Sequence, residues 1–121
     1  MSAPFGTTVL EHFRRPRNRR ALESPTAVHE AFNPLCGDRV RIELRIADDI
    51  VREAAFTASA CAICTASASL LTERLTGLTL AGARAITERD LALSLDTEVP
   101  AARARCVALP LEAMRVALAA H

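Results

Sequence analysis

Lysine, tryptophan and tyrosine are missing from this chain of 121 residues, and phenylalanine occurs only four times. Because all fifteen basic residues are arginine, catalysis through a lysine Schiff base is excluded. The formal net charge of +1 gives no general attraction to nucleic acid or to anionic membranes. No apolar run approaches the roughly 18 residues of a membrane span, and the first residues lack a signal-peptide pattern. We therefore expect a soluble, cytoplasmic protein.

Half of the residues are hydrophobic, which is enough for a modest core, and the length suits a single domain over residues 1–121. The clearest periodicity lies in RVRIELRI, residues 39–46, where apolar and charged side chains alternate as in a half-buried strand. A turn at residues 47–49 and a second apolar segment then predict an antiparallel hairpin over about residues 39–58.

The register of this hairpin predicts which distant residues meet. If Ile46 pairs with Ile50 around a three-residue loop, Ile42 faces Ala54 and position 36 lies opposite position 60. Residues 36, 38 and 61 should then come together at one end of the hairpin.

The remaining segments predict helices and loops. We expect a short helix carrying Val9 and Phe13, a helix over about 62–75 that stops near Gly77, and a third over roughly 79–87. A last helix follows Pro100, and because of Pro110 it either starts after residue 106 or bends there. The sequence thus predicts an α+β fold in which a small antiparallel sheet packs with helices.

All four cysteines lie in three short stretches, CGDRV, ACAICTASAS and ARCVAL. In a reducing compartment such thiols are more often metal ligands or transfer thiols than disulfides. Cys61 and Cys106 fall at predicted helix N-termini, where the helix dipole favours the thiolate. With Cys36 and the nearby carboxylate of Asp38 they make four candidate ligands for a tetrahedral ion or an iron-sulfur cluster. Gly37 lets the loop between Cys36 and Asp38 fold closely around a metal.

Three ordered segments resemble the metal-site segments of the U-type iron-sulfur assembly proteins, the IscU, SufU and NifU N-terminal-domain proteins. They are NPLCGD (33–38), CAICTASASLLTE (61–73) and RCVAL (105–109), and the resemblance extends from LEHFRRPRN (10–18) to the final helix. It implies a compact α+β fold with the metal or cluster site at Cys36, Asp38, Cys61 and Cys106. It also implies a scaffold that accepts sulfur from a pyridoxal-phosphate cysteine desulfurase, assembles a labile [2Fe-2S] cluster and passes it to acceptor proteins.

Some details of these motifs favour the SufU branch of this family and others favour the IscU branch. Arg105 stands where IscU proteins usually have histidine and SufU proteins have a basic residue, which favours SufU. The interval from Cys61 to Cys106 favours IscU, because it lacks the extra segment of SufU proteins. VPAAR (99–103) keeps only one proline and the basic end of the IscU chaperone motif LPPVK, so a dedicated Hsp70 partner is not expected.

Two alternatives to the scaffold stay open at this point. One is a SufU-like zinc-dependent sulfurtransferase that relays persulfide sulfur, and the other is a closed structural zinc domain, so the bound ion is Zn²⁺ or Fe²⁺. Cys106, next to Arg105, is the expected sulfur acceptor. Cys64 is expected to be a small buried helix residue rather than a spare ligand or acceptor. The arginines at 14, 15, 17, 19 and 20 suit docking to an acidic partner such as the desulfurase.

Overall fold

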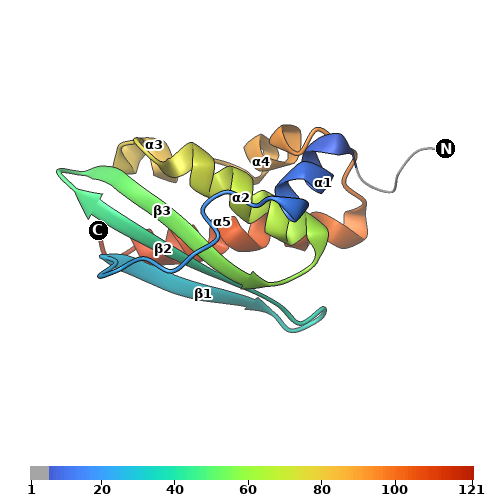
Figure 1. Ribbon diagram of the computed structural model, residues 1–121, viewed down its shortest axis with the longest axis horizontal. Helices are drawn as coiled ribbons and strands as arrows, with labels where there is room; N and C mark the ends of the chain where they lie inside the picture. The colour runs from blue at the N-terminus through green and yellow to red at the C-terminus, as the bar shows by residue number, and fades with distance from the viewer. Residues whose placement is uncertain (1–5) are drawn as a thin grey trace.

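The computed structural model describes residues 6–121, which form a three-stranded antiparallel sheet packed with helices (Figure 1). The strands are β1 (Ala27–Asn33), β2 (Asp38–Ala47) and β3 (Ile50–Ser59). The helices are α1 (Thr7–Arg14), α2 (Ala62–Leu75), α3 (Leu80–Arg84), α4 (Glu88–Ser94) and α5 (Ala104–Leu118), and a 3-10 turn at Ala101–Arg103 leads into α5. The expected α+β class is confirmed. None of the helices within residues 6–121 has the length and hydrophobicity needed to cross a membrane.

The predicted hairpin exists as β2 and β3, but its predicted register is wrong by two residues. Ile42 pairs with Phe56 rather than with Ala54, and Ala47 pairs with Ile50 around a two-residue turn. Asp48 and Asp49 adopt φ angles of 55° and 58°, the pattern of a type I′ turn that matches the twist of the strands. From Glu53 onward this two-residue shift leaves the side chains on their predicted faces, because they alternate with a period of two. A bulge between Arg45 and Ile46 shifts the pairing next to the turn by one residue instead. Val51, rather than Ile50, therefore pairs with Ile46 and is fully buried.

Strand β1 was not predicted from the sequence, and its side-chain pattern explains why. The small residues Ala27 and Ala31 point into the core, whereas Val28 and the exposed Phe32 lie on the outer face. The bulky apolar residues of β1 therefore lie on the outer face of the sheet. Those of β2, such as Val40 and Ile42, lie on the core face and are fully buried. The alternation of β1 is real, but hydrophobicity alone does not reveal it.

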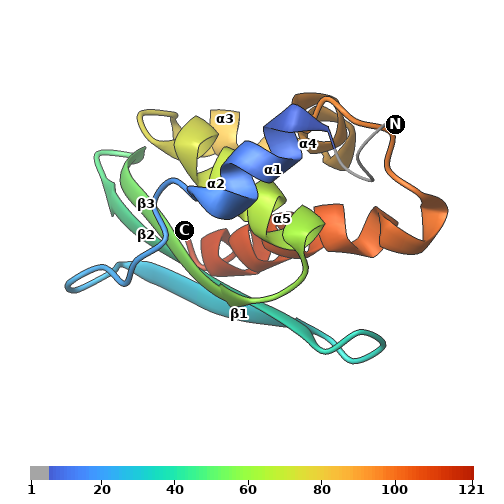
Figure 2. The ribbon, with the colours of Figure 1, turned by 45° about the vertical axis from the view of Figure 1, so that its right-hand side comes forward.

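Helices α2 and α5 cover one face of the sheet, with α5 against β1 and β2 and α2 against β3 (Figures 1 and 2). Helix α1 packs on α2 from the outside. Most of the largest fully buried side chains come from the sheet and from these two covering helices, and they include Ile42, Phe56, Ile63, Leu71, Leu111 and Met114. Strands β2 and β3 and helices α2 and α5 are thus locked to one core, which holds their ends in a fixed arrangement.

The helix predicted over roughly 79–87 is shorter in the structure, because α3 ends at Arg84, and the following helix α4, which begins at Glu88, was not predicted. Thr87 and Asp90 form a capping box, in which each side chain accepts a hydrogen bond from the other residue's backbone N–H. The spacing of threonine and aspartate is the signal in the sequence that could have located α4.

Helix α5 begins at Ala104, before Cys106, so a start after residue 106 is wrong. The helix runs through Pro110, which has no N–H to donate to the carbonyl of Cys106 four residues earlier. The hydroxyl of Ser67 in α2 donates to the next carbonyl, that of Val107, over 2.8 Å. The first turn of α5 therefore lacks one backbone hydrogen bond of its own and is stabilised in part by the hydrogen bond from α2.

Candidate metal centre

Cys36 lies in the turn that joins β1 to β2. Asn33 closes this turn, since its carbonyl accepts the N–H of Gly37 over 2.8 Å and its side chain accepts the N–H of Leu35 over 3.1 Å. Gly37 has a φ of 79°, which a residue with a side chain rarely adopts. A Cβ on Gly37 would meet nothing within 4 Å, so its backbone conformation, rather than a close approach, requires glycine. The turn leaves Cys36 exposed.

Asp38 is the first residue of β2 and is only 6% exposed. Its Oδ1 accepts the backbone N–H of Cys61 over 3.2 Å, and the Cys106 Sγ lies 3.7 Å from its Oδ2. Cys61 is the N-cap of α2, as predicted, and its sulfur accepts the N–H of Cys64 over 3.5 Å. Asp38 therefore ties the start of β2 to the start of α2 and faces the first turn of α5.

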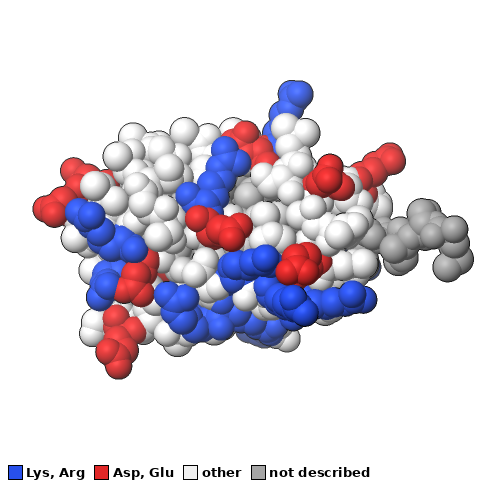
Figure 3. Space-filling view, turned by 45° about the horizontal axis from the view of Figure 1, so that its top comes forward, with Lys and Arg blue, Asp and Glu red and all other residues white. Residues whose placement is uncertain are grey.

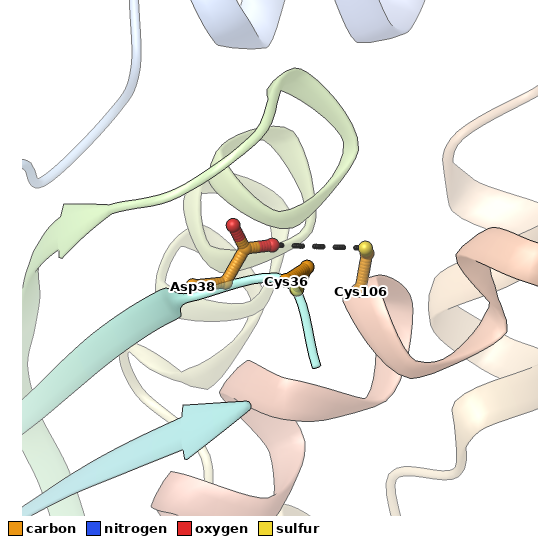
Figure 4. A group of neighbouring side chains, drawn as sticks. All are labelled: Cys36, Asp38 and Cys106. Carbon is orange, nitrogen blue, oxygen red and sulfur yellow. Dashed lines mark hydrogen bonds between the residues drawn. The ribbon is translucent and has the colours of Figure 1, made fainter. Parts of the chain in front are cut away.

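The ligand atoms of Cys36, Asp38 and Cys106 all lie within 4.8 Å of one another (Figure 4). Cys61, the fourth predicted ligand, is not part of this group of ligand atoms but lies beside it, since its backbone N–H donates to Asp38. Thiolate sulfur is the donor that zinc, iron and iron-sulfur clusters prefer, and a carboxylate completes many zinc sites. The donor set therefore fits either a zinc ion or a cluster, held at the end of the sheet where α2 and α5 begin (Figure 1).

Cys106 does not have the thiolate character that its place in the first turn of α5 led us to expect. Burial, followed by the neighbouring Cys61 thiol, raises the pKa of Cys106 to about 12, although a hydrogen bond from Arg103 acts in the opposite direction. Desolvation by burial disfavours the charged form of the thiol. A metal that binds Cys106 must therefore displace its proton.

Arg103 was missed as a site residue by the sequence analysis. The pKa of Arg103 is raised, mainly by a hydrogen bond to Cys106 and next by the charge of Cys61. The signal in the sequence is its position three residues before Cys106, which places both on one side of a helical start. Arg105, the neighbour that we singled out, is exposed and lines a cavity next to Cys36 and Cys106.

Cys64 is completely buried in α2 and packs in the hydrophobic core. Burial is the main reason that its pKa is raised far above that of a free thiol, with the charges of Asp38 and Cys61 acting in the same direction. It does not belong to the group of ligand atoms formed by Cys36, Asp38 and Cys106. These properties are those of a small apolar core residue.

Replacement of Cys64 by serine should leave metal binding by the protein nearly unchanged. The expected cost is a loss of stability of about 1–3 kcal/mol, because a hydroxyl in this position needs a hydrogen-bond partner. Metal titration followed by a thermal melt of the Cys64→Ser protein measures both effects. Release of the metal at unchanged fold would instead make Cys64 a working ligand.

Comparison with known proteins places the chain in a family. Residues 5–121 match the family model described as the NifU-like N terminal domain. The iron-sulfur cluster assembly scaffold protein IscU of Aquifex aeolicus is 31% identical over 120 residues, 98% of this chain and 76% of that protein. The zinc-dependent sulfurtransferase SufU of Bacillus subtilis is 36% identical over 73 residues, 60% of this chain and 49% of that protein.

The fold is also that of solved structures. A putative iron-sulfur cluster assembly scaffold protein for the SUF system from Fervidobacterium islandicum AW-1 superposes with a TM-score of 0.82 at 21% identity, covering 94% of this chain and 96% of that one. The chain spans about a quarter to a half of the length of several curated relatives that it matches. Because the family model matches residues 5–121 of this chain and the match to IscU covers three-quarters of that protein, the chain belongs to the U-type iron-sulfur cluster assembly family, together with IscU, SufU and the N-terminal domain of NifU.

Proposed function

We propose that this chain is a scaffold that accepts sulfur from a pyridoxal-phosphate cysteine desulfurase, assembles a labile [2Fe-2S] cluster and passes it to acceptor proteins. The observation that carries the proposal is the mixed and open donor set. Cys36 is exposed on a turn, Asp38 supplies an oxygen among sulfurs, and a cavity of about 500 Å³ adjoins Cys36 and Cys106. An iron-sulfur cargo that must leave needs a site of this kind, accessible and with one weaker ligand.

The residues of the site have different roles in the proposed function. Cys36, Asp38, Cys61 and Cys106 hold the cargo, and Cys106 is the sulfur acceptor because it lines the cavity and faces Arg103. The guanidinium of Arg103 stabilises the negative charge that forms on sulfur when a persulfide is made or discharged. Asp38 orients the N-terminus of α2 through the N–H of Cys61.

The desulfurase is proposed to dock through exposed arginines near α1. Arg14 and Arg15 are exposed and make no ion pair with any carboxylate in residues 6–121, whereas Arg17 and Arg20 are paired with acidic residues of this chain. Basic side chains gather in a band along the lower edge of the face shown in Figure 3. Such a surface favours encounter with an acidic partner, most strongly at low salt. The reaction needs reduced thiols, so we place the protein in the cytoplasm.

A second candidate is a zinc-dependent sulfurtransferase, and the observation that favours it is the similarity to SufU of Bacillus subtilis. In that case Cys106 relays persulfide sulfur while zinc is held by the same ligands. A closed structural zinc domain is less well supported, because Cys36 is exposed and the neighbouring cavity leaves the donors open to solvent.

Metal content and absorption of protein purified without oxygen distinguish these candidates. The scaffold should contain iron and inorganic sulfide and absorb visible light after incubation with iron, cysteine and a desulfurase. The sulfurtransferase should contain zinc, remain colourless under the same conditions and still accept labelled sulfur. Zinc with neither colour nor sulfur acceptance would identify a structural zinc domain and contradict the proposal.

A further inference from the structure

A cavity of about 500 Å³ lies against the thiols of Cys36 and Cys106, and its other side is formed by the start of α5 and the 3-10 turn before it. This volume is within the range of small-molecule sites in proteins, roughly 300–1,000 Å³. The lining includes the exposed Leu35 and the small side chains of Ala101 and Ala102. A small molecule that enters the cavity therefore reaches the expected sulfur acceptor directly.

The charged groups that line this cavity are both cationic, Arg103 and Arg105. Within residues 6–121 neither guanidinium lies within 4.0 Å of a carboxylate, unlike those of Arg39, Arg41 and Arg45 on β2. The nearby carboxylate of Asp38 is engaged by the N–H of Cys61 and the thiol of Cys106. Two uncompensated guanidinium groups at the mouth of a small cavity favour a ligand that carries a carboxylate, which arginine binds through charge-assisted hydrogen bonds.

We propose that the cavity binds a small thiol bearing a carboxylate, and that this thiol takes the sulfur from a persulfide on Cys106. This inference rests on the proposed role of Cys106 as sulfur acceptor. The thiolate of the ligand attacks the outer sulfur of the Cys106 persulfide and forms a new sulfur–sulfur bond. The old bond breaks, its electron pair stays on the Sγ of Cys106 as a thiolate beside Arg103, and the outer sulfur leaves with its hydrogen as the persulfide of the small thiol. No oxidant or reductant is needed.

The test uses three thiols that differ in charge: 3-mercaptopropionate is anionic, 2-mercaptoethanol neutral and cysteamine cationic. Protein carrying labelled persulfide is mixed with each thiol, and the rate of label transfer is measured for wild type, Arg105→Gln and Arg103→Gln. For each thiol, the rate with wild type is divided by the rate with the variant. The intrinsic reactivity of the thiol affects both rates equally, so this ratio reports only the effect of the substitution. Arg52→Gln is the control, because Arg52 lies on β3 and pairs with Asp48 at the far end of the sheet.

Arg105→Gln should slow transfer to 3-mercaptopropionate by roughly tenfold, the effect of one charge-assisted hydrogen bond, and should leave cysteamine unaffected or faster. Arg103→Gln should slow all three thiols, because Arg103 also touches Cys106, with the anionic thiol slowed most. Equal slowing of the three thiols by Arg105→Gln, or the same pattern in Arg52→Gln, would overturn the inference.

Binding without sulfur transfer separates this inference from the proposed function. Calorimetric titration with 3-(methylthio)propionate, which has the carboxylate but cannot accept sulfur, should show binding to wild type and Arg52→Gln and roughly tenfold weaker binding to Arg105→Gln. Absence of binding to wild type contradicts the anion site whether or not persulfide forms. Binding without any persulfide on Cys106 would instead contradict the sulfur-acceptor role, and with it the transfer step.

Discussion

Incubation with a cysteine desulfurase and cysteine should place a persulfide on Cys106, and Cys106→Ser should abolish the main labelled product. Cys106 lines the open cavity, whereas the sulfur of Cys61 is engaged by the N–H of Cys64 at the N-terminus of α2. Arg103 beside Cys106 stabilises the thiolate that must attack the donor persulfide. Mass spectrometry of alkylated peptides locates the added sulfur.

Local structure also gives Cys106 freedom to leave its position next to Asp38. Pro110 cannot donate to the carbonyl of Cys106, so the first turn of α5 lacks one of its helical hydrogen bonds. The contact between the Cys106 thiol and Asp38, at 3.7 Å, is a weak one. Rotation of the Cys106 side chain would therefore bring its sulfur further into the cavity without breaking a backbone hydrogen bond.

Cys64→Ser is the matched control for this experiment, because Cys64 is a buried thiol close to the same site. It should accept sulfur on Cys106 at nearly the wild-type rate. Persulfide that forms unchanged in Cys106→Ser would show that another cysteine, with the exposed Cys36 as the first choice, is the acceptor.

The sequence predicted two of the three strands of the sheet. β2 and β3 were predictable because Val40, Ile42 and Leu44 alternate with charged residues, and Cys61 was predictable as the start of α2. The register was not predictable, because the turn uses two aspartates with positive φ where asparagine and glycine are more usual. The missing strand β1 matters more, since it makes the Cys36 segment a hairpin turn and not a free loop.

Electrostatics of the site were the least predictable part. The position of Cys106 in the first turn of a helix suggests a thiolate, yet its burial depends on the packing of α5 against α2 and the sheet, which no local pattern reveals. The role of Arg103 depends on the 3-10 turn that precedes α5 and sets the direction from which the chain enters the helix. Both features arise from tertiary structure, and both alter the chemistry expected at Cys106.

Asp38→Ala should slow transfer of the cluster to an acceptor apoprotein by about a hundredfold, the lower end of what a positioned base contributes, and lengthen the lifetime of the cluster on this chain. The oxygen ligand is the one that an incoming thiol displaces most easily from iron, since iron in a cluster prefers sulfur. Once displaced, the carboxylate can take the proton of the incoming thiol. Both steps are lost with alanine, while the three thiolates still hold the cluster.

The structure also predicts a stability cost for Asp38→Ala that has nothing to do with metal. Loss of the carboxylate leaves the N–H of Cys61 without its acceptor, at a cost of about 1–3 kcal/mol. Asp38→Asn is therefore the matched variant, because its amide oxygen can still accept that N–H while the charge and the base are removed. It should transfer the cluster as slowly as Asp38→Ala but unfold at nearly the wild-type temperature.

Melting temperatures measured with and without a chelator separate the scaffold from a structural zinc domain. A metal that binds only the folded state stabilises it by linkage, so a structural site should lose this metal-dependent part of its stability in both variants. For the scaffold, the difference between Asp38→Ala and Asp38→Asn should be the same with and without chelator, because it arises from the Cys61 hydrogen bond. Transfer at the wild-type rate in Asp38→Asn would contradict a role for this carboxylate in releasing the cluster.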